Sequence, residues 1–368
     1  MMKPILTILS WIYGAVISIR HRLYNWGVFK SYSFDIPVVC IGNITVGGTG
    51  KTPMAEMIIS QLAERYNLAM LSRGYGRSTK GYYEVHTTDN YLNVGDEPLQ
   101  VKLKFPDTVV VVSEDRVSAI NRIRKEHPEV NLIIMDDGFQ HRKVRAKVNI
   151  IILDATRPVE SDYLLPKGRL RDLKSRLNKA HFFIVSKCSE HMTALDRRLW
   201  RNKLCTVAYQ KVYFSHIVPK GIEPLFYFEE REDVDYGCQA ILLAGVGNPR
   251  PFIREAQVRF NIVDKMIMPD HHVYNKVDMK RLGEMLARHP RAIILMTEKD
   301  AIKLFRVRSL PEQLRRAMFY QPIETTLLEG PDKDFIGHLI SDIEFKEQKS
   351  GDKSKEKGKE IILEEEKI

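Results

Sequence analysis

Residues 37–62 constrain the fold of this chain more than any other stretch. The apolar run "PVVCIG" leads directly into the glycine-rich segment "NITVGGTGKT", and a helical pattern of apolar residues follows. A buried strand, a tight turn and a helix in immediate succession form one unit of a parallel α/β sheet. Gly47, Gly48 and Gly50 allow the backbone N–H groups of the turn to point inward. The turn is therefore predicted to hold a phosphate at the helix N-terminus.

The pattern around these glycines is that of a P-loop, except that Thr45 replaces the usual first glycine. In such a loop Lys51 reaches the β- and γ-phosphates, and the Thr52 hydroxyl is a ligand for Mg²⁺. The position of the motif between an apolar strand and a helix supports this interpretation. The residues expected to bind the nucleotide are Thr45, Val46, Gly47, Gly48, Thr49, Gly50, Lys51 and Thr52.

Two adjacent carboxylates are expected to complete a metal site. Asp136 and Asp137 follow the apolar run "NLIIM", and P-loop proteins hold Mg²⁺ with an aspartate at the end of a neighbouring strand. Either residue can be the direct ligand. A guanine-binding strand end would read Asn/Thr-Lys-x-Asp, but "VSKCSE" has Ser189 in place of the aspartate and "MTEKD" has Glu298 in place of the lysine. ATP is therefore the expected nucleotide, and Mg²⁺ the expected cofactor.

Apolar runs alternate with helical patterns along most of the chain, which predicts a parallel sheet covered by helices on both faces. The expected strands of the first part are 37–42, 68–72, 108–113, 131–136, 148–153 and 182–187. A segment with strand-like alternation and Pro and Gly breaks follows, and is interpreted as a linker or hairpin before a second α/β pattern. The expected fold class is α/β, with a P-loop NTPase-like parallel sheet and a second, smaller α/β domain.

The two ends of the chain differ from these domains. No acidic residue precedes Asp35, and Trp11, Tyr13, Tyr24 and Trp26 accompany arginines in an apolar segment. This combination is typical of an amphipathic helix at a membrane surface, and an ordinary buried helix is the alternative. The expected divisions are a membrane-associated helix (1–34), a nucleotide-binding domain (35–208), a linker (209–235), a second domain that closes the cleft (236–344) and a disordered charged tail (345–368).

The formal net charge of +10 lies in the body of the chain, because seven acidic residues balance the seven lysines of the tail. A basic body fits nucleic acid, anionic lipid or a phosphorylated substrate. The cations are not interleaved with aromatic residues, so we expect no nucleic-acid partner. Four widely spaced cysteines without a C-x-x-C pair indicate reduced thiols in the cytoplasm. We expect the protein to be a monomer.

Six strings of the sequence occur in the order found in one enzyme family. They are "GNITVGGTGKTP", "LSRGYGR", "VGDEP", "DDGFQHR", "LLPKGRLRD" and "PDHHVY". By these strings residues 1 to about 340 resemble tetraacyldisaccharide 4'-kinase, the lipid A 4'-kinase family of Gram-negative bacteria. The resemblance implies transfer of the γ-phosphate of ATP to the 4'-hydroxyl of tetraacyldisaccharide 1-phosphate in lipopolysaccharide biosynthesis. It also implies a location at the cytoplasmic face of the inner membrane.

Phosphoryl transfer to a sugar hydroxyl needs a base near the acceptor and cations around the transferred group. Asp96 matches the family string "VGDEP" and is expected to be the base. His272 or His271 of "PDHHVY" is expected to orient Asp96 from the second domain. Such a pair would form only across the cleft, which would couple domain closure to chemistry. Lys51 and Arg116 are the expected catalytic cations.

Polar residues that follow predicted strands are candidates for substrate contacts, because ligands of α/β sheets bind at that edge. The expected substrate-binding residues are Arg73, Arg77, Gln140 and Arg171, and surface salt bridges are the alternative for the two arginines of "SRGYGR". The family usually has a glutamate where Asp172 stands. The alternative function is a membrane-associated P-loop ATPase or switch protein, which leaves "VGDEP" and "PDHHVY" without a role.

Overall fold

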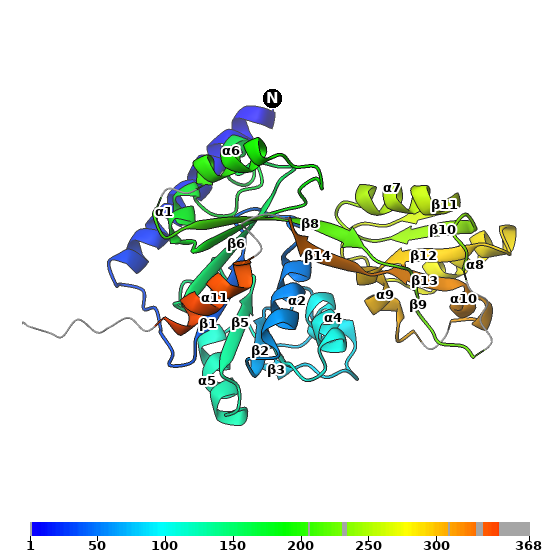
Figure 1. Cartoon of the computed structure of the whole chain (residues 1–368), viewed down its shortest axis with the longest axis horizontal. Helices are drawn as coiled ribbons and strands as arrows, with labels where there is room; N and C mark the ends of the chain where they lie inside the picture. The colour runs from blue at the N-terminus through cyan, green and yellow to red at the C-terminus, as the bar shows by residue number, and fades with distance from the viewer. Residues whose placement is uncertain (1, 205–206, 230–233, 308–309, 329–333, 346–368) are drawn as a thin grey trace, which may run out of the picture.

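The computed structural model describes residues 2–204, 207–229, 234–307, 310–328 and 334–345. Within these residues the chain forms two α/β domains, and the N-terminal helix lies on the side of the first domain that faces away from the second (Figure 1). The expected fold class is confirmed. The charged tail after residue 345 lies outside the described residues.

The first domain is built on a nine-stranded sheet in the order β14-β8-β7-β6-β1-β5-β2-β4-β3. The inner strands pair in parallel, and the edge strands β3 and β14 are antiparallel to their neighbours. The six strands expected from the sequence are confirmed to within one residue at each end. The strands are β1 (Val38–Gly42), β2 (Leu68–Ser72), β3 (Tyr83–Glu84), β4 (Val109–Val112), β5 (Leu132–Asp136), β6 (Val148–Asp154), β7 (Phe182–Ser186), β8 (Lys211–Pro219) and β14 (Ile323–Leu327).

Helices cover both faces of this sheet, because alternate strand residues point to opposite faces and both sets are apolar. Helices α2 (Lys51–Leu62) and α11 (Phe335–Glu344) pack on one face, and α5 (Arg116–Glu126) packs on the other. The loops that follow the neighbouring strands β1 and β5 therefore meet at one edge of the sheet. The remaining helices of this domain are α3 (Tyr91–Val94), α4 (Asp96–Lys104), α6 (Ala194–Leu204) and two 3-10 turns, Val159–Ser161 and Lys174–Lys179.

Helix α1 (Met2–Asn25) is continuous and contacts the first domain with polar groups of one face. The Tyr13 hydroxyl donates to the carbonyl of Arg171 at 3.1 Å, and His21 Nε2 lies 2.7 Å from Asp172 Oδ1. In length and composition the helix would suffice to cross a membrane. Its exposed apolar side chains are Ile5, Ile8, Leu9, Trp11, Ile12, Val16 and Ile19.

The second domain is a smaller sheet of five strands in the order β11-β10-β12-β13-β9. Three of its pairings are parallel, and β9 is antiparallel to β13. Its strands are β9 (Glu223–Pro224), β10 (Gln239–Ala244), β11 (Asn261–Ile267), β12 (Ile293–Thr297) and β13 (Met318–Gln321). Its helices are α7 (Arg250–Arg259), α8 (Lys276–Arg288), α9 (Glu298–Leu304) and α10 (Glu312–Ala317).

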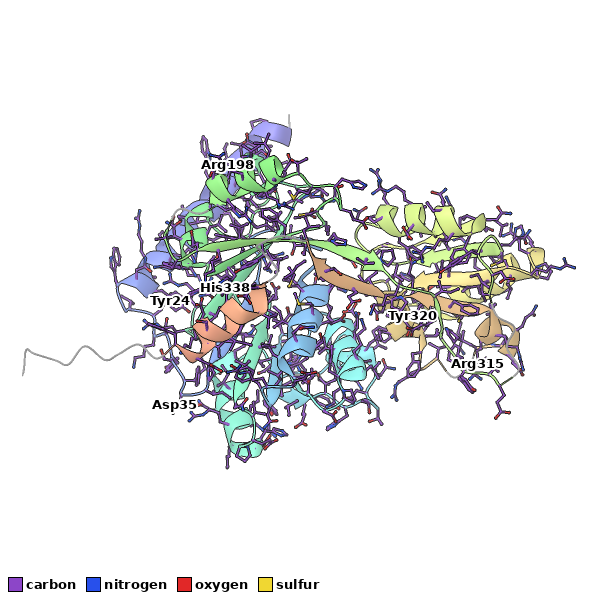
Figure 2. All side chains as sticks on the ribbon, viewed as in Figure 1. Tyr24, Asp35, Arg198, Arg315, Tyr320 and His338 are labelled. Carbon is purple, nitrogen blue, oxygen red and sulfur yellow. The ribbon has the colours of Figure 1, made fainter. Side chains whose placement is uncertain are left out.

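The structure divides the chain differently from the expectation at two places. Strand β8 lies within the expected linker 209–235, yet it belongs to the first sheet. The second domain, expected over 236–344, returns to the first domain at β14, which pairs with β8, and α11 buries apolar residues in the first core. His338 of α11 lies 2.7 Å from the Tyr213 hydroxyl of β8 (Figure 2). A local apolar pattern predicts a strand or a helix, but not which of two sheets it joins.

Candidate active site

The glycine-rich loop between β1 and α2 has the backbone that phosphate binding requires. Gly50 precedes α2 with φ +88°, and Gly47 has φ +100°, both in the left-handed region that favours glycine. A Cβ added at Gly47 or Gly48 would meet no protein atom within 4 Å. There is therefore free space beside the loop at these two glycines, and the N–H groups of the first turn of α2 have no partner within the helix.

Residues from outside the loop hold its backbone in place. Asn43 Nδ2 donates to the Thr49 hydroxyl at 2.8 Å, and the Ser186 hydroxyl donates to the Thr49 carbonyl at 2.5 Å. Lys187, at the end of β7, donates to the carbonyl of Gly48. The loop is thus fixed from two strands before any nucleotide binds, which lowers the entropy cost of binding.

The two aspartates that follow β5 have different surroundings. Arg171 donates to both carboxylate oxygens of Asp137, and Lys51 Nζ lies 3.7 Å from Asp137 Oδ1. Although burial raises the pKa of Asp137, Arg171 and Lys51 lower it by more, so this residue is a carboxylate. Burial, reinforced by the charges of Glu97 and Asp137, raises the pKa of Asp136 to about 7.

The residues at this edge fit a magnesium ion. Asp136 is almost fully buried, and within the described ranges its Oδ1 makes no hydrogen bond. The part of the chain that the structure describes has no group of three or more His, Cys, Asp or Glu that would hold a metal by itself. Mg²⁺ is usually bound through one or two carboxylates together with substrate phosphates and water. Asp136 and the Thr52 hydroxyl provide such oxygen donors beside the P-loop.

Asp96 begins α4 and contacts the second domain. His271 Nδ1 lies 3.1 Å from Asp96 Oδ2, and Lys299 Nζ lies 3.5 Å from the same oxygen. Gly95 precedes it with φ +96°, and a Cβ there would lie 3.3 Å from Gly74 Cα, so the loop before α4 packs tightly against the "SRGYGR" loop.

The charges around Asp96 keep it ionised. Burial alone raises the pKa of Asp96, but the hydrogen bond with His271 and the charge of Lys299 lower it to about 2. The hydrogen bond with Asp96 is the largest effect on His271 and raises its pKa above the usual value. A carboxylate and an imidazole joined in this way can hold and pass a proton at neutral pH.

Only one of the two histidines expected here faces Asp96. His271 has φ +57° and turns toward α4, whereas His272 Nε2 lies 2.9 Å from Asp278 Oδ2 in the first turn of α8. Asp278 also belongs to the capping box of that helix. His272 therefore holds the loop to α8, and His271 reaches the other domain. The left-handed backbone at His271 sends the two neighbouring side chains in different directions.

Three residues expected to contact phosphate or substrate brace the loops at this edge in the structure, and their contact with a ligand stays a prediction. Arg116 is buried and donates to the carbonyls of Asp136 and Asp137 at 3.2 and 3.4 Å. Gln140 Nε2 donates to the carbonyl of Asn43 at 2.7 Å. Arg171 spans from Asn43 to Asp137, so it ties the start of the P-loop to the end of β5.

The two arginines of "SRGYGR" differ in exposure. The Arg77 side chain is 2% exposed and donates to Glu114 Oε1 and the Gly81 carbonyl, each at 2.6 Å. The structure thus shows Arg77 in a salt bridge, which was the alternative to a substrate contact for this residue. Arg73 is exposed, and no side-chain hydrogen bond of it is found among the described residues. The expected contact of Arg73 with the substrate stays a prediction.

Lys299 and Tyr75 are site residues that sequence reasoning missed. Lys299 Nζ lies 3.5 Å from Asp270 Oδ1 and 3.7 Å from Glu97 Oε1, in addition to its contact with Asp96. The Tyr75 ring lies 5.2 Å from that of His271. Lys299 is the second residue after strand β12, at the edge of a sheet where ligands bind, and this position is the signal by which the sequence could have indicated it.

Known proteins resemble this chain over almost its full length. The sequence profile of the family described as tetraacyldisaccharide-1-P 4'-kinase matches residues 2–342. A protein from Porphyromonas gingivalis named tetraacyldisaccharide 4'-kinase is 38% identical over 346 residues, which cover 92% of this chain and 96% of that protein. A protein of the same name from Bacteroides fragilis is 36% identical over 340 residues, or 90% of each chain.

One solved structure has a similar fold. The crystal structure of LpxK from Aquifex aeolicus in complex with ATP matches this chain with a TM-score of 0.73 and 24% sequence identity. The match covers 94% of this chain and 100% of that one. At this identity the likeness concerns the fold alone.

Proposed function

Because the chain belongs to the tetraacyldisaccharide-1-P 4'-kinase family, we propose that it carries out that family's reaction where the P-loop edge of the first domain meets Asp96, His271 and Lys299. The enzyme phosphorylates the 4'-hydroxyl of tetraacyldisaccharide 1-phosphate in lipid A biosynthesis, with ATP as the donor. The observation that carries the proposed site is the contact of His271 with Asp96 across the two domains.

The P-loop edge supplies the donor side of the reaction. The related protein from Aquifex aeolicus was solved with ATP, and in this chain the glycine loop, Lys51 and Arg171 provide a cationic surface that suits a nucleotide. Lys51 would hold the β- and γ-phosphates. Arg171 would stay on Asp137 and keep the loop in register. Charge placed in advance around the transferred group is the main contribution an enzyme makes to phosphoryl transfer.

Asp96 and His271 supply the acceptor side. The oxygen of the 4'-hydroxyl attacks the γ-phosphorus, its bond to phosphorus forms, and the bond from the γ-phosphorus to the bridging oxygen of ADP breaks. The hydroxyl proton passes to the Asp96 carboxylate, which His271 and Lys299 hold in the ionised form. His271 holds and orients that carboxylate through its contact with Oδ2, so Asp96 itself acts as the general base.

Asp136 and Thr52 would hold a magnesium ion beside the phosphates, with Asp136 as the carboxylate ligand. When bound, Mg²⁺ neutralises charge that develops on the phosphate oxygens. Binding of a cation would also favour the ionised form of Asp136, whose pKa is raised by burial and by the charges of Glu97 and Asp137.

The exposed apolar face of α1 supports attachment to the cytoplasmic face of the inner membrane. Its bulky residues include Trp11, and Arg20 and Arg22 lie toward the end of the helix, which suits an interface with anionic lipid. The opposite face is fixed to the kinase domain by Tyr13 and His21, so we propose that the helix lies along the membrane surface rather than across it.

The test is the transfer of γ-³²P from ATP to tetraacyldisaccharide 1-phosphate in mixed micelles, with wild type beside Lys51→Ala. We expect labelled lipid from wild type alone, and its absence after addition of a chelator. Hydrolysis of ATP without labelled lipid would contradict the proposal and would favour the alternative of an ATPase or switch. Sedimentation with anionic liposomes, compared before and after deletion of residues 1–30, tests the role of α1.

A further inference from the structure

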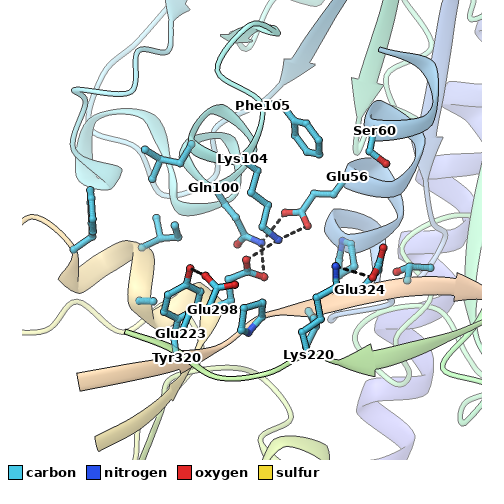
Figure 3. A pocket seen from close by; sticks show the side chains of 18 of the residues that line it. Glu56, Ser60, Gln100, Lys104, Phe105, Lys220, Glu223, Glu298, Tyr320 and Glu324 are labelled. Atoms are coloured by element: carbon cyan, nitrogen blue, oxygen red, sulfur yellow. Dashed lines mark hydrogen bonds and ion pairs between the residues drawn. The ribbon is translucent and has the colours of Figure 1, made fainter. Parts of the chain in front are cut away.

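A second ionic contact joins the two domains away from the proposed site. Lys104 Nζ, at the end of α4, lies 2.7 Å from Glu56 Oε2 of α2 and 2.6 Å from Glu298 Oε1 of α9 (Figure 3). Gln100 Nε2 donates to Glu56 Oε1 at 2.7 Å. One lysine is thus shared by two carboxylates, of which one belongs to the first domain and one to the second.

This cluster is largely shielded from water. The side chains of Glu56 and Glu298 are 8% and 7% exposed, and that of Lys104 is 29% exposed. The three residues line a cavity of about 590 Å³ between the domains. Burial raises the pKa of Glu56, although Lys104 opposes that effect. At such burial two carboxylates can stay close together only if a cation lies between them.

The cluster joins the three helices whose first turns form the proposed site. On α4, Asp96, Gln100 and Lys104 follow each other at intervals of four residues, so they lie along one face. On α9, Glu298 directly precedes Lys299, which contacts Asp96. A shift of α9 along α4 at the cluster would therefore move Lys299 relative to Asp96.

Helix α2, on the donor side, likewise carries one residue of the proposed site and one residue of the cluster. On α2, Glu56 lies one turn after Thr52, whose hydroxyl is the expected Mg²⁺ ligand. Each helix thus carries one group of the proposed site in its first turn and one group of the cluster elsewhere along it, one residue before it on α9, one turn after it on α2 and two turns after it on α4. Through these contacts the cluster links the helix that follows the P-loop, the helix that begins with Asp96 and the second domain.

We propose that Lys104, Glu56 and Glu298 are positioning residues that set the register between the two domains, so that Lys299 and His271 meet Asp96. The inference rests on the proposed roles of Asp96 and His271. None of the three residues touches the reacting groups in the structure. They act through α4 and α9. Their loss should therefore lower the rate of phosphate transfer and leave ATP binding unchanged.

The cluster makes a definite prediction about charge. Loss of the cation leaves Glu56 and Glu298 facing each other across the interface, and their repulsion pushes the domains apart. Removal of one of those carboxylates in the same protein relieves the repulsion. The second change should therefore restore part of what the first one loses, which a general loss of packing would not do.

The experiment compares Lys104→Met with the double variant Lys104→Met/Glu298→Gln, and uses Lys220→Met as the control. Lys220 lines the same cavity and pairs with Glu324 at 2.8 Å, but that pair is about half exposed. For each protein we would measure kcat, the KM for ATP and the pH profile of kcat/KM with the lipid acceptor.

Lys104→Met should lower kcat by about tenfold or more and leave the KM for ATP within about twofold. The acid limb of its pH profile should move to higher pH, because Asp96 loses the two partners that lower its pKa. The double variant should recover part of kcat, and Lys220→Met should match wild type.

Three results would overturn the inference. They are a kcat within about twofold of wild type in Lys104→Met, an equal fall in Lys220→Met, or a double variant no more active than the single one. If Asp96→Asn retains normal kcat, the proposed function fails first. If Asp96→Asn is inactive and Lys104→Met has a normal kcat, the proposed function stands and only the positioning role of the cluster is wrong.

Discussion

The donor and acceptor sides of the site are built in different ways. The donor side lies within the first domain, where Asn43, Ser186 and Lys187 hold the backbone of the P-loop and Arg171 links it to Asp137. The acceptor side is assembled from both domains, because Asp96 belongs to α4 of the first domain while His271 and Lys299 belong to the second domain.

The difference indicates which step each side can control. A loop braced by one domain is ready for a nucleotide whatever the other domain does. A base that depends on a partner from the second domain is complete only when the two domains are together. In the proposed site ATP binding is therefore separate from the competence to transfer phosphate, as expected when closure completes a catalytic group.

The largest effect is expected on the donor side. Lys51→Met removes the cation from the transferred phosphate and should lower kcat on the order of 10³-fold. Asp137 keeps its bonds from Arg171, so the fold should be unchanged. Steady-state transfer to the lipid and circular dichroism would check both points. A loss smaller than tenfold would show that the braced loop, without its lysine, is sufficient.

The two neighbouring histidines offer a matched pair on the acceptor side. His271→Ala removes the partner of Asp96 and should lower kcat by about 10²-fold, whereas His272→Ala breaks only the contact with Asp278 and should cost threefold or less, roughly. Kinetics of the two proteins under one set of conditions would decide the matter. Equal losses would mean that the loop as a whole matters, and a larger loss in His272→Ala would reverse the assignment.

Lys299→Met tests the charge that the second domain brings to Asp96. Lys299 is one of the groups that lower the pKa of Asp96 to about 2, so its removal raises that pKa. Below the new pKa the base is protonated, and the acid limb of kcat/KM therefore moves to higher pH. We expect kcat at neutral pH to fall by about tenfold. Lys280→Met, which removes an exposed lysine of the same domain, should leave the profile in place. A profile unchanged in Lys299→Met would remove this lysine from the site.

The smallest effect concerns stability at the donor edge. Burial raises the pKa of Asp136 to about 7, so its stabilising contribution is complete below the unfolded-state value of about 3.9 and is lost as the pH rises through about 7. Asp136→Asn has no such dependence. Its melting temperature relative to wild type, measured with a chelator present, should be about 2 °C or more higher at pH 8 than at pH 5. The same difference at both pH values would mean that Asp136 is ionised throughout.

The donor side could be predicted from the sequence almost in full. Its signals are contiguous, since strand, glycines, Lys51 and Thr52 follow one another and need only local geometry to meet. Asp136 and Asp137 were predicted together, and their different surroundings depend on Arg171, which reaches them from a distant loop. Arg116 and Gln140 were expected near the phosphate, and their contacts with backbone carbonyls became visible only in the fold.

The acceptor side could be predicted only in part. Asp96 was found through the family strings. The sequence alone, however, does not show which of the neighbouring residues His271 and His272 turns its side chain toward Asp96. That choice is made by a single left-handed residue in the loop. Lys299 lies about 200 residues from Asp96 in the sequence, and no local pattern links them. The return of β14 and α11 to the first domain was missed for the same reason, because pairing between distant strands is a property of the whole chain.

The central claim is that Asp96, completed by the second domain, takes the proton of the acceptor and has no part in holding ATP. Single-turnover transfer of γ-³²P to tetraacyldisaccharide 1-phosphate by Asp96→Asn, with the affinity for ATP measured on the same protein, tests it most directly. We predict that ATP binds as in wild type while the rate of transfer falls by about 10²-fold or more. A normal rate of transfer, or a loss explained entirely by weaker ATP binding, would contradict the claim.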